Sequence, residues 1–206
     1  TGYSETFTYE TPLNVPDLDA TTMTEVKPTT AKAASVVISE NGSEITEKGF
    51  CLSKTEKEPT IENTKVVVNG STATYSVVLS NLESATTYYI RSYATNSKGT
   101  GYGEVAEFTT AVEIGETTVN GITDTDASVS AEILTPAEHL AITEKGFCYS
   151  SVNAVPTVAD TKKVSSTQGN SITASLTGLA DHTKYYICAY VVNDKGTYYG
   201  AVHELS

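Results

Sequence analysis

The side chains that could carry out catalysis or hold a metal are few and scattered along this chain of 206 residues. It has three histidines, none with a Cys, His or carboxylate partner at metal-ligand spacing. They are His139, His182 and His203. Three cysteines are too few and too dispersed for a disulfide-stapled scaffold or a zinc site. No nucleophile-elbow, phosphate-binding or dinucleotide motif occurs. We expect a protein that is not an enzyme and needs no cofactor or metal.

Tyrosines and one arginine are the most suggestive group of side chains. In the segment 88–95 residues alternate, so that if Tyr88 and Ile90 point inward, Tyr89, Arg91 and Tyr93 share the outer face of a strand. The candidate interaction surface comprises Tyr89, Arg91, Tyr93, Tyr102, Tyr186, Tyr190 and Tyr199. Exposed Tyr and Arg are enriched at interaction surfaces, and tyrosine rings can stack on sugars. The alternative is that these side chains form cross-strand pairs that stiffen the sheet.

Charge and hydropathy narrow the range of partners. The formal net charge is −12. Phosphate binding requires clustered Lys and Arg, so nucleic acid and anionic membrane surfaces are disfavoured as partners. No apolar run reaches the roughly 18 residues of a membrane-spanning helix, so we expect no transmembrane segment.

A long internal repeat organises the chain. The heptapeptide Ile-Thr-Glu-Lys-Gly-Phe-Cys occurs at 45–51 and again at 142–148. From there the copies align without a gap, with 28 identities over the 65 positions of 45–109 and 142–206. Such a repeat is long enough to be an independently folding domain. Glu47 and Glu144, the best-matched carboxylates, fall one in each copy, whereas a catalytic pair must share one pocket.

The elements that position these residues are short β-strands. Thr, Val and Tyr are abundant, and turn signals such as 41–43 and 69–71 separate the alternating segments. No helical apolar stripe is present. The pattern within each copy therefore predicts about seven short strands that form a β-sandwich. We expect a first domain over 15–110 and a second over 111–206.

The repeated pattern around the longest predicted strand resembles that of fibronectin type III domains. The first copy shows it as Leu82, Thr86, Tyr88, Ile90, Ser92, Ala94, Asn96 and Gly99. The second copy shows it as Leu179, Thr183, Tyr185, Ile187, Ala189, Val191, Asn193 and Gly196. The wider pattern is similar to the fibronectin III-like repeats of Bacteroidetes surface and secreted proteins. The resemblance implies an all-β fold of two tandem Ig-like β-sandwich domains, with Tyr88 and Tyr185 as structural tyrosine corners.

The chain departs from the family at one core position. The tryptophan usual on strand B of fibronectin type III domains is missing, and small residues such as Ala33 and Ser35 lie there instead. The resemblance also bears on the cysteines, because strands C and F adjoin in such a sheet and would carry Cys148 and Cys188. Two interpretations stay open, namely free packed thiols or a strand-to-strand disulfide. The first copy has Arg91 where the second has Cys188, so it cannot form the same bridge.

The N-terminal segment 1–14 resembles the end of the repeat, as a partial third copy would. Residues 1–5 align with 100–104, and Tyr9 falls where Phe108 does. We expect it to be a strand or the remnant of a preceding repeat, with residues 2–10 paired to a sheet edge. The alternative is an unstructured leader.

These observations suggest two functions. The first is a non-catalytic spacer, adhesion or protein-interaction module of a bacterial surface or secreted protein. The alternative is a glycan-binding module that uses outward-facing tyrosines on the sheets formed by strands C, F and G. In either case we expect a location that is extracellular, at the cell surface with or without a lipid anchor, or periplasmic. The partner would be a protein or a glycan.

Overall fold

The computed structural model describes residues 13–136 and 140–206, and within them every regular element is a β-strand. The expected strand pairing of residues 2–10 lies outside the described residues. In the first half the strands are β1 (Asp17–Leu18), β2 (Thr22–Thr24), β3 (Ala31–Ser39), β4 (Glu47–Ser53), β5 (Thr64–Val67), β6 (Thr74–Leu79), β7 (Thr87–Asn96), β8 (Gly99–Tyr102) and β9 (Ala106–Thr109). In the second half they are β10 (Thr118–Ile122), β11 (Asp126–Glu132), β12 (Glu144–Ser150), β13 (Thr161–Val164), β14 (Ser171–Thr177), β15 (Tyr185–Asn193), β16 (Gly196–Tyr199) and β17 (His203–Leu205).

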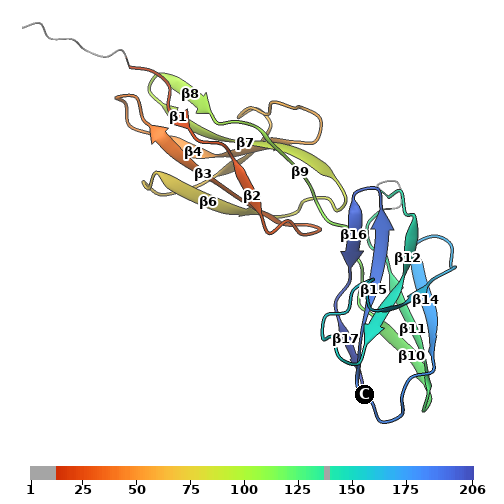
Figure 1. Cartoon of the computed structure of the whole chain (residues 1–206). Helices are drawn as coiled ribbons and strands as arrows, with labels where there is room; N and C mark the ends of the chain where they lie inside the picture. Colours follow the sequence, from red (N-terminus) through yellow and green to blue (C-terminus); the bar gives the residue numbers. More distant parts are fainter. Residues whose placement is uncertain (1–12, 137–139) are drawn as a thin grey trace, which may run out of the picture. The chain divides into compact units, whose positions relative to one another are not determined.

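The strands divide into two units, β1–β9 and β10–β17 (Figure 1). In the first unit one sheet has the order β1-β3-β2 with β6 also paired to β3. The other has the order β5-β4-β7-β8 with β9 also paired to β7. In the second unit the sheets are β10-β11-β14 and β13-β12-β15-β16, with β17 also paired to β15. The pairings among β1–β8 and among β10–β17 are antiparallel.

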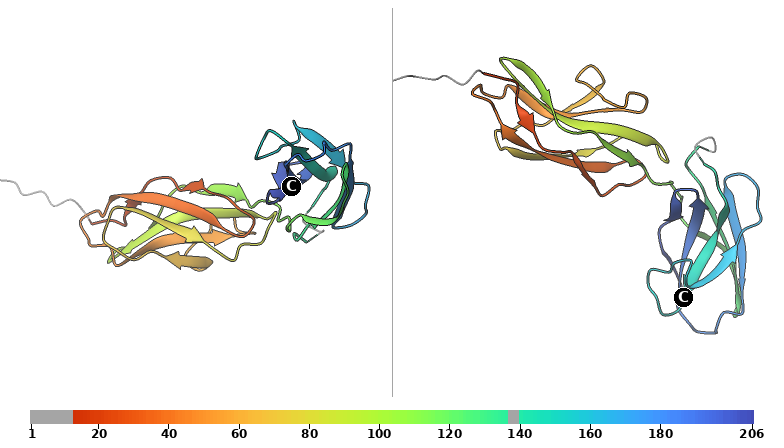
Figure 2. Two further views of the ribbon diagram at one scale, coloured as in Figure 1. Left: turned by 90° about the horizontal axis from the view of Figure 1, so that it is seen from below. Right: turned by 45° about the horizontal axis from the view of Figure 1, so that its top comes forward.

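The two layers of each unit can be followed in Figure 2. The expected all-β sandwich fold is confirmed. Counting the interrupted edge strands β1/β2, β8/β9 and β16/β17 once each, each unit has seven strands among the described residues.

The core of the first unit lies between its two sheets. Along β3 the burial alternates, so that Ala31, Ala33, Ser35 and Val37 face inward, as period-two geometry requires. The small residues expected in place of the missing tryptophan therefore do line the core. Aromatic rings from other strands supply the bulk. Phe50 of β4 packs against Tyr75 of β6 with 5.3 Å between ring centroids.

The core of the second unit is more uniformly apolar. Phe147 of β12 occupies the place of Phe50 and is fully buried. Around it are packed Ala127, Val129, Ala131, Ile133, Ile172, Leu176, Ile187, Ala189 and Val191. Ile172 stands at the repeat position of Tyr75, so the aromatic partner of the first unit is an aliphatic side chain here.

Two turns expected from the sequence have the left-handed backbone that they require. Asn41 has φ 52° and Gly42 has φ 79° between β3 and β4, and Gly70 has φ 110° between β5 and β6. Between β8 and β9 the edge strand is interrupted at 103–105. A side chain at Gly103 would collide with the Ser92 hydroxyl and the Asp19 carbonyl, which explains the glycine.

In the part of the chain that the structure describes, no helix is long and apolar enough to cross a membrane.

Candidate interaction surface

The outer faces of the two five-stranded sheets hold the tyrosines singled out in the sequence. In the first unit Tyr89, Arg91 and Tyr93 of β7 lie opposite Ser53, Cys51 and Gly49 of β4, respectively. The alternation along β7 therefore places the three side chains on one face. Whether they are available to a partner is decided by what covers them.

Tyr93 is fully buried although it is on the outer face. Gly49 lies directly opposite it, and without a side chain there the tyrosine ring can lie across the strand. The Tyr93 hydroxyl donates a 2.9 Å hydrogen bond to the carboxylate of Glu47. Lys65 of the neighbouring β5 binds the same carboxylate at 2.9 Å, and its Nζ lies 6.0 Å from the Tyr93 ring centroid. The lysine stem and the carboxylate cover the ring.

The same arrangement recurs in the second unit. Tyr190 lies opposite Gly146 and is fully buried. Its hydroxyl donates a 2.8 Å bond to Glu144, which Lys162 binds at 2.7 Å. We call each such triplet, Glu47/Lys65/Tyr93 and Glu144/Lys162/Tyr190, the Glu–Lys–Tyr cluster of its unit. The expectation that Tyr93 and Tyr190 are exposed at the surface is wrong, because the facing glycine and the covering lysine bury them.

The clusters shift the pKa values of their members in opposite directions. The hydrogen bond from Lys65, and then that from Tyr93, lower the pKa of Glu47 below its usual value. Lys162 and Tyr190 lower the pKa of Glu144 in the same way. Burial, followed by the hydrogen bond to the carboxylate, raises the pKa of Tyr93 and of Tyr190. Both glutamates are therefore held as carboxylates within structural ion pairs.

Arg91 is also engaged within the first unit. Its Nε donates to the Pro59 carbonyl and a terminal nitrogen donates to the Glu58 carbonyl at 3.4 Å. Its guanidinium carbon lies 4.1 Å from the ring centroid of Tyr102, within cation–π range. The Tyr102 hydroxyl in turn accepts a 3.3 Å bond from the Ile61 N–H. Arg91 and Tyr102 thus fasten the 54–63 loop to the sheet.

The second unit keeps part of this fastening. The Tyr199 hydroxyl accepts a 3.2 Å bond from the Val158 N–H, although 40% of the tyrosine remains exposed. Tyr186 is half-buried, with Lys184 Nζ 5.5 Å from its ring centroid. Tyr89 is half-buried as well. Of the seven predicted surface residues, Tyr199 is exposed, whereas the side chains at positions 89, 91, 102 and 186 are half-buried.

All three cysteines are buried, and none is bonded to another in the structure. Cys51 donates its S–H toward the Pro59 carbonyl, with 3.2 Å between sulfur and oxygen. In the second unit Cys148 lies directly opposite Cys188 across β12 and β15, and the two Sγ atoms are 3.3 Å apart. The hydrogen bond between the thiols, together with burial, raises the pKa of Cys148. The same bond lowers the pKa of Cys188 because it stabilises the Cys188 thiolate.

Both predicted tyrosine corners make contacts within their own units. Tyr185 accepts a 3.1 Å hydrogen bond on its hydroxyl from the Ala180 N–H, which closes the loop before β15. Tyr88 is buried and its ring stacks on Phe108, with centroids 5.6 Å apart and planes at 18°. The hydrogen bond between the Tyr185 hydroxyl and the loop before β15 contributes about 1 kcal/mol to stability.

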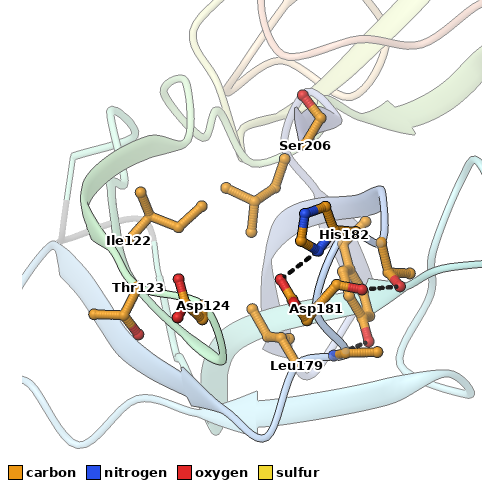
Figure 3. Close-up of a pocket in the computed structure, with 11 residues that line it drawn as sticks. Ile122, Thr123, Asp124, Leu179, Asp181, His182 and Ser206 are labelled. Atoms are coloured by element: carbon orange, nitrogen blue, oxygen red, sulfur yellow. Dashed lines mark hydrogen bonds and ion pairs between the residues drawn. The ribbon is translucent and has the colours of Figure 1, made fainter.

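A pocket of about 340 Å³ opens at the loop end of the second unit and brings Asp181, His182 and Ser206 together (Figure 3). His182 Nδ1 lies 2.8 Å from Asp181 Oδ1. Figure 3 shows no bond between His182 and Ser206, so the histidine is not placed to act as a base for the serine hydroxyl. The imidazole is 91% exposed, which leaves the pair screened by water. Across the described ranges no three His, Cys, Asp or Glu side chains gather to hold a metal.

The second unit also has an apolar surface loop that no sequence motif indicates. Residues 151–155, which we call the valine loop, expose 92% of Val152 and 67% of Val155. The equivalent residues 54–58 of the first unit read Lys-Thr-Glu-Lys-Glu. The signal was present in the repeat alignment, since a charged loop in one copy is aligned with an apolar loop in the other.

The sequence matches no protein-family model and no curated protein. Solved structures with similarity to the chain include a segment of two fibronectin type III domains from chicken tenascin. That segment is 16% identical, with a TM-score of 0.47, over 94% of this chain and 99% of the segment. The FN1–FN3 domains of chicken CNTN1 are 18% identical, with a TM-score of 0.37, over 95% of this chain and 69% of that one.

Proposed function

We propose that the chain is a non-catalytic interaction module of an extracellular bacterial surface or secreted protein, and that its second unit contacts a protein partner through the valine loop. The observation that carries this proposal is the exposure of Val152 and Val155 in a loop whose counterpart is charged. Residues that recur in both copies serve the fold, whereas a specific contact is expected where the copies differ. Exposed apolar side chains grouped in this way are typical of protein contacts.

The valine loop is held in one conformation by its own hydrogen bonds. The Ser150 hydroxyl accepts bonds from the Val152 and Asn153 N–H groups at 3.3 and 3.0 Å. The Asn153 side chain accepts a 3.1 Å bond from the Val155 N–H and donates a 3.1 Å bond to Asp160. A loop that is already ordered loses less conformational entropy on binding. The two valines are thus presented on a pre-organised loop.

The first unit is a weaker candidate for a partner contact, and this difference supports the proposal. The side chains on the outer face of its five-stranded sheet make contacts within the unit. Arg91 and Tyr102 hold the 54–63 loop, and Tyr93 is buried in its Glu–Lys–Tyr cluster. We infer that the first unit acts as a spacer that carries the second. We also propose an extracellular location, because the repeats resemble those of bacterial surface proteins.

Site-specific photo-cross-linking tests the contact. A benzophenone amino acid at position 152 should give a discrete adduct in cells that express the full protein, because it replaces an exposed apolar side chain. The matched control is the same amino acid at position 55, the equivalent residue of the first unit, which should give none. Adducts of equal yield at both positions, or none at 152, contradict the proposed contact. Protease treatment of intact cells tests the compartment, since a surface protein is cleaved and an internal one is spared.

The glycan-binding alternative has less support. It retains Tyr199 as its best candidate, with 40% of the residue exposed. Tyr93 and Tyr190 no longer contribute because both are buried. A glycan array would favour this alternative if binding were seen and were lost in Tyr199→Ala while being kept in Val152→Thr.

A further inference from the structure

We propose that Cys148 and Cys188 are the two halves of a disulfide that links β12 to β15 in the second unit. The two residues are directly opposite each other in the antiparallel pair. Their sulfur atoms are already 3.3 Å apart. Forming the bond requires them to approach by about 1.2 Å, to the S–S length of about 2.05 Å. This inference does not depend on the proposed partner contact.

The register suits such a bond. Residues directly opposite on antiparallel strands have Cα atoms about 4.5–5.5 Å apart, and disulfides occur with Cα atoms about 4.4–6.8 Å apart. No strand needs to shift, because the two thiols share the outer face of one sheet. The 40-residue separation between the cysteines closes a sizeable loop of the unfolded chain.

The neighbours of the two thiols also favour the pairing. Both sulfur atoms lie 3.4 Å from one acceptor, the Pro156 carbonyl oxygen. Oxidation removes these bonds, but a thiol is a weak donor and little is lost. In the first unit the corresponding Pro59 carbonyl accepts a charge-assisted bond from Arg91. The second unit has cysteine there, which gives up that stronger bond and gains the ability to cross-link.

The reaction balances with a low-molecular-weight disulfide such as glutathione disulfide as the oxidant. The Cys188 thiolate attacks one sulfur of glutathione disulfide, forms a mixed disulfide and releases one glutathione thiolate. The Cys148 thiolate then attacks the Cys188 sulfur and releases the second glutathione. Two protein thiols are oxidised, one glutathione disulfide is reduced to two thiols, and the two protein protons pass to water or to the released thiolates.

Burial sets when this reaction takes place. Cys148 is fully buried and Cys188 is 1% exposed, so an oxidant cannot reach them in the folded unit. Oxidation therefore takes place during folding, while the strands are still accessible. Once formed, the bond is shielded from external thiols by the same burial.

Refolding under controlled redox conditions tests the proposal. The full chain is refolded with glutathione disulfide or with a reductant, denatured, and alkylated to count its thiols by mass. We expect one free thiol, that of Cys51, after oxidising refolding and three after reducing refolding. Peptide mapping should show Cys148 joined to Cys188. Three free thiols, or cysteines capped by glutathione, after oxidising refolding would overturn the proposal.

Thermal unfolding of the same samples provides a second readout. The bridge should raise the melting temperature of the second unit by roughly 10 °C or more and leave that of the first unit unchanged. The matched control is the Cys148→Ala/Cys188→Ala variant, in which reductant should have no effect. A melting temperature that falls on oxidation contradicts the proposal, since the bond would then strain the fold.

Discussion

The two units bury different chemistry at the same positions of the sandwich. In the first, the hydroxyls of Ser35 and Ser92 lie 3.0 and 3.4 Å from the Asp19 carbonyl and 3.1 Å from each other. Tyr75 completes this polar cluster, and burial, opposed by hydrogen bonds from Ser92 and Ser35, raises its pKa to about 12. Before residue 45 the two copies match at an offset of 96, because Thr22 pairs with Ala34 as Thr118 pairs with Ser130. The second unit therefore has Ala131, Ala189 and Ile172 at the three positions.

All three core positions are polar in the first unit and apolar in the second, so these side chains have changed together as a group. A buried donor or acceptor is costly when its partner is missing, so the members of a hydrogen-bonded network are best kept or lost together. The Glu–Lys–Tyr clusters are kept in both units because each of their members bonds another. Thr117 is the exception, since its Oγ1 has no partner among the described residues.

The largest expected effect tests whether the buried tyrosines are equivalent in the two units. Tyr93→Ala and Tyr190→Ala should each lower the unfolding free energy of their own unit by about 3–5 kcal/mol, because each removes a fully buried ring. Hydrogen exchange in the full chain reports each unit separately. The control Tyr93→Phe keeps the ring and should cost only about 1 kcal/mol for the lost bond to Glu47. A loss below about 1 kcal/mol in Tyr93→Ala would show that the ring is accessible.

Removing the serines of the polar cluster should give a non-additive result. Ser92→Ala alone should cost about 1 kcal/mol, because Ser35 still donates to the Asp19 carbonyl. Ser35→Ala/Ser92→Ala removes both ends of their mutual 3.1 Å bond together, so it should cost about 0.5–1 kcal/mol less than the sum of the single changes. A double-mutant cycle followed by urea unfolding measures the coupling. Strict additivity would show that the serines act independently.

Thr21 and Thr117 occupy equivalent positions but should respond differently to the same substitution. The Thr21 hydroxyl accepts a 2.8 Å bond from the buried Ser92 N–H. Thr21→Val should therefore destabilise the first unit by about 1–2 kcal/mol. Thr117→Val removes an unpartnered hydroxyl and should be neutral or slightly stabilising. Chemical denaturation of both variants provides the comparison, and an equal loss in the two would contradict the assigned roles.

The smallest expected effect is on the pH dependence of stability. The pKa values of Glu47 and Glu144 lie below the ordinary 4.5 in the folded state. Their contribution is therefore present above about pH 4.5 and is lost as the pH falls through the lowered folded values. Because Glu47 is 36% exposed and Glu144 33%, water limits each contribution to under about 1 kcal/mol.

Urea unfolding between about pH 6 and pH 3 measures this contribution. The control Glu47→Gln/Glu144→Gln should lose less stability over the same range, because its amides do not titrate. An unchanged acid slope in that variant would place the titrating groups elsewhere in the chain.

Much of the fold follows from local properties of the sequence. The repeat, the turns at Asn41 and Gly70 and the alternation along β3 and β7 depend on backbone conformation and on neighbours one or two residues away. The face of the sheet on which Tyr89, Arg91 and Tyr93 lie was predictable for the same reason. Their exposure was not, because it depends on residues of other strands.

Tyr93 illustrates the difference between facing and exposure. Its outward direction is set by the period of its own strand, but its burial is set by Gly49 and Glu47 on β4 and by Lys65 on β5. The missing core tryptophan could likewise be read from the chain, whereas its replacement by the packing of Phe50 on Tyr75 could not. Such contacts join residues far apart in the sequence.

The cysteines mark the same division. The sequence by itself determined that the second unit has Cys148 and Cys188 where the first has Cys51 and Arg91. Only the tertiary structure decided that the two sulfur atoms lie 3.3 Å apart beneath the Pro156 carbonyl. The reason is physical, since a residue's type and the face it occupies are local properties, whereas its partner across the sheet is fixed by the register that the whole core selects.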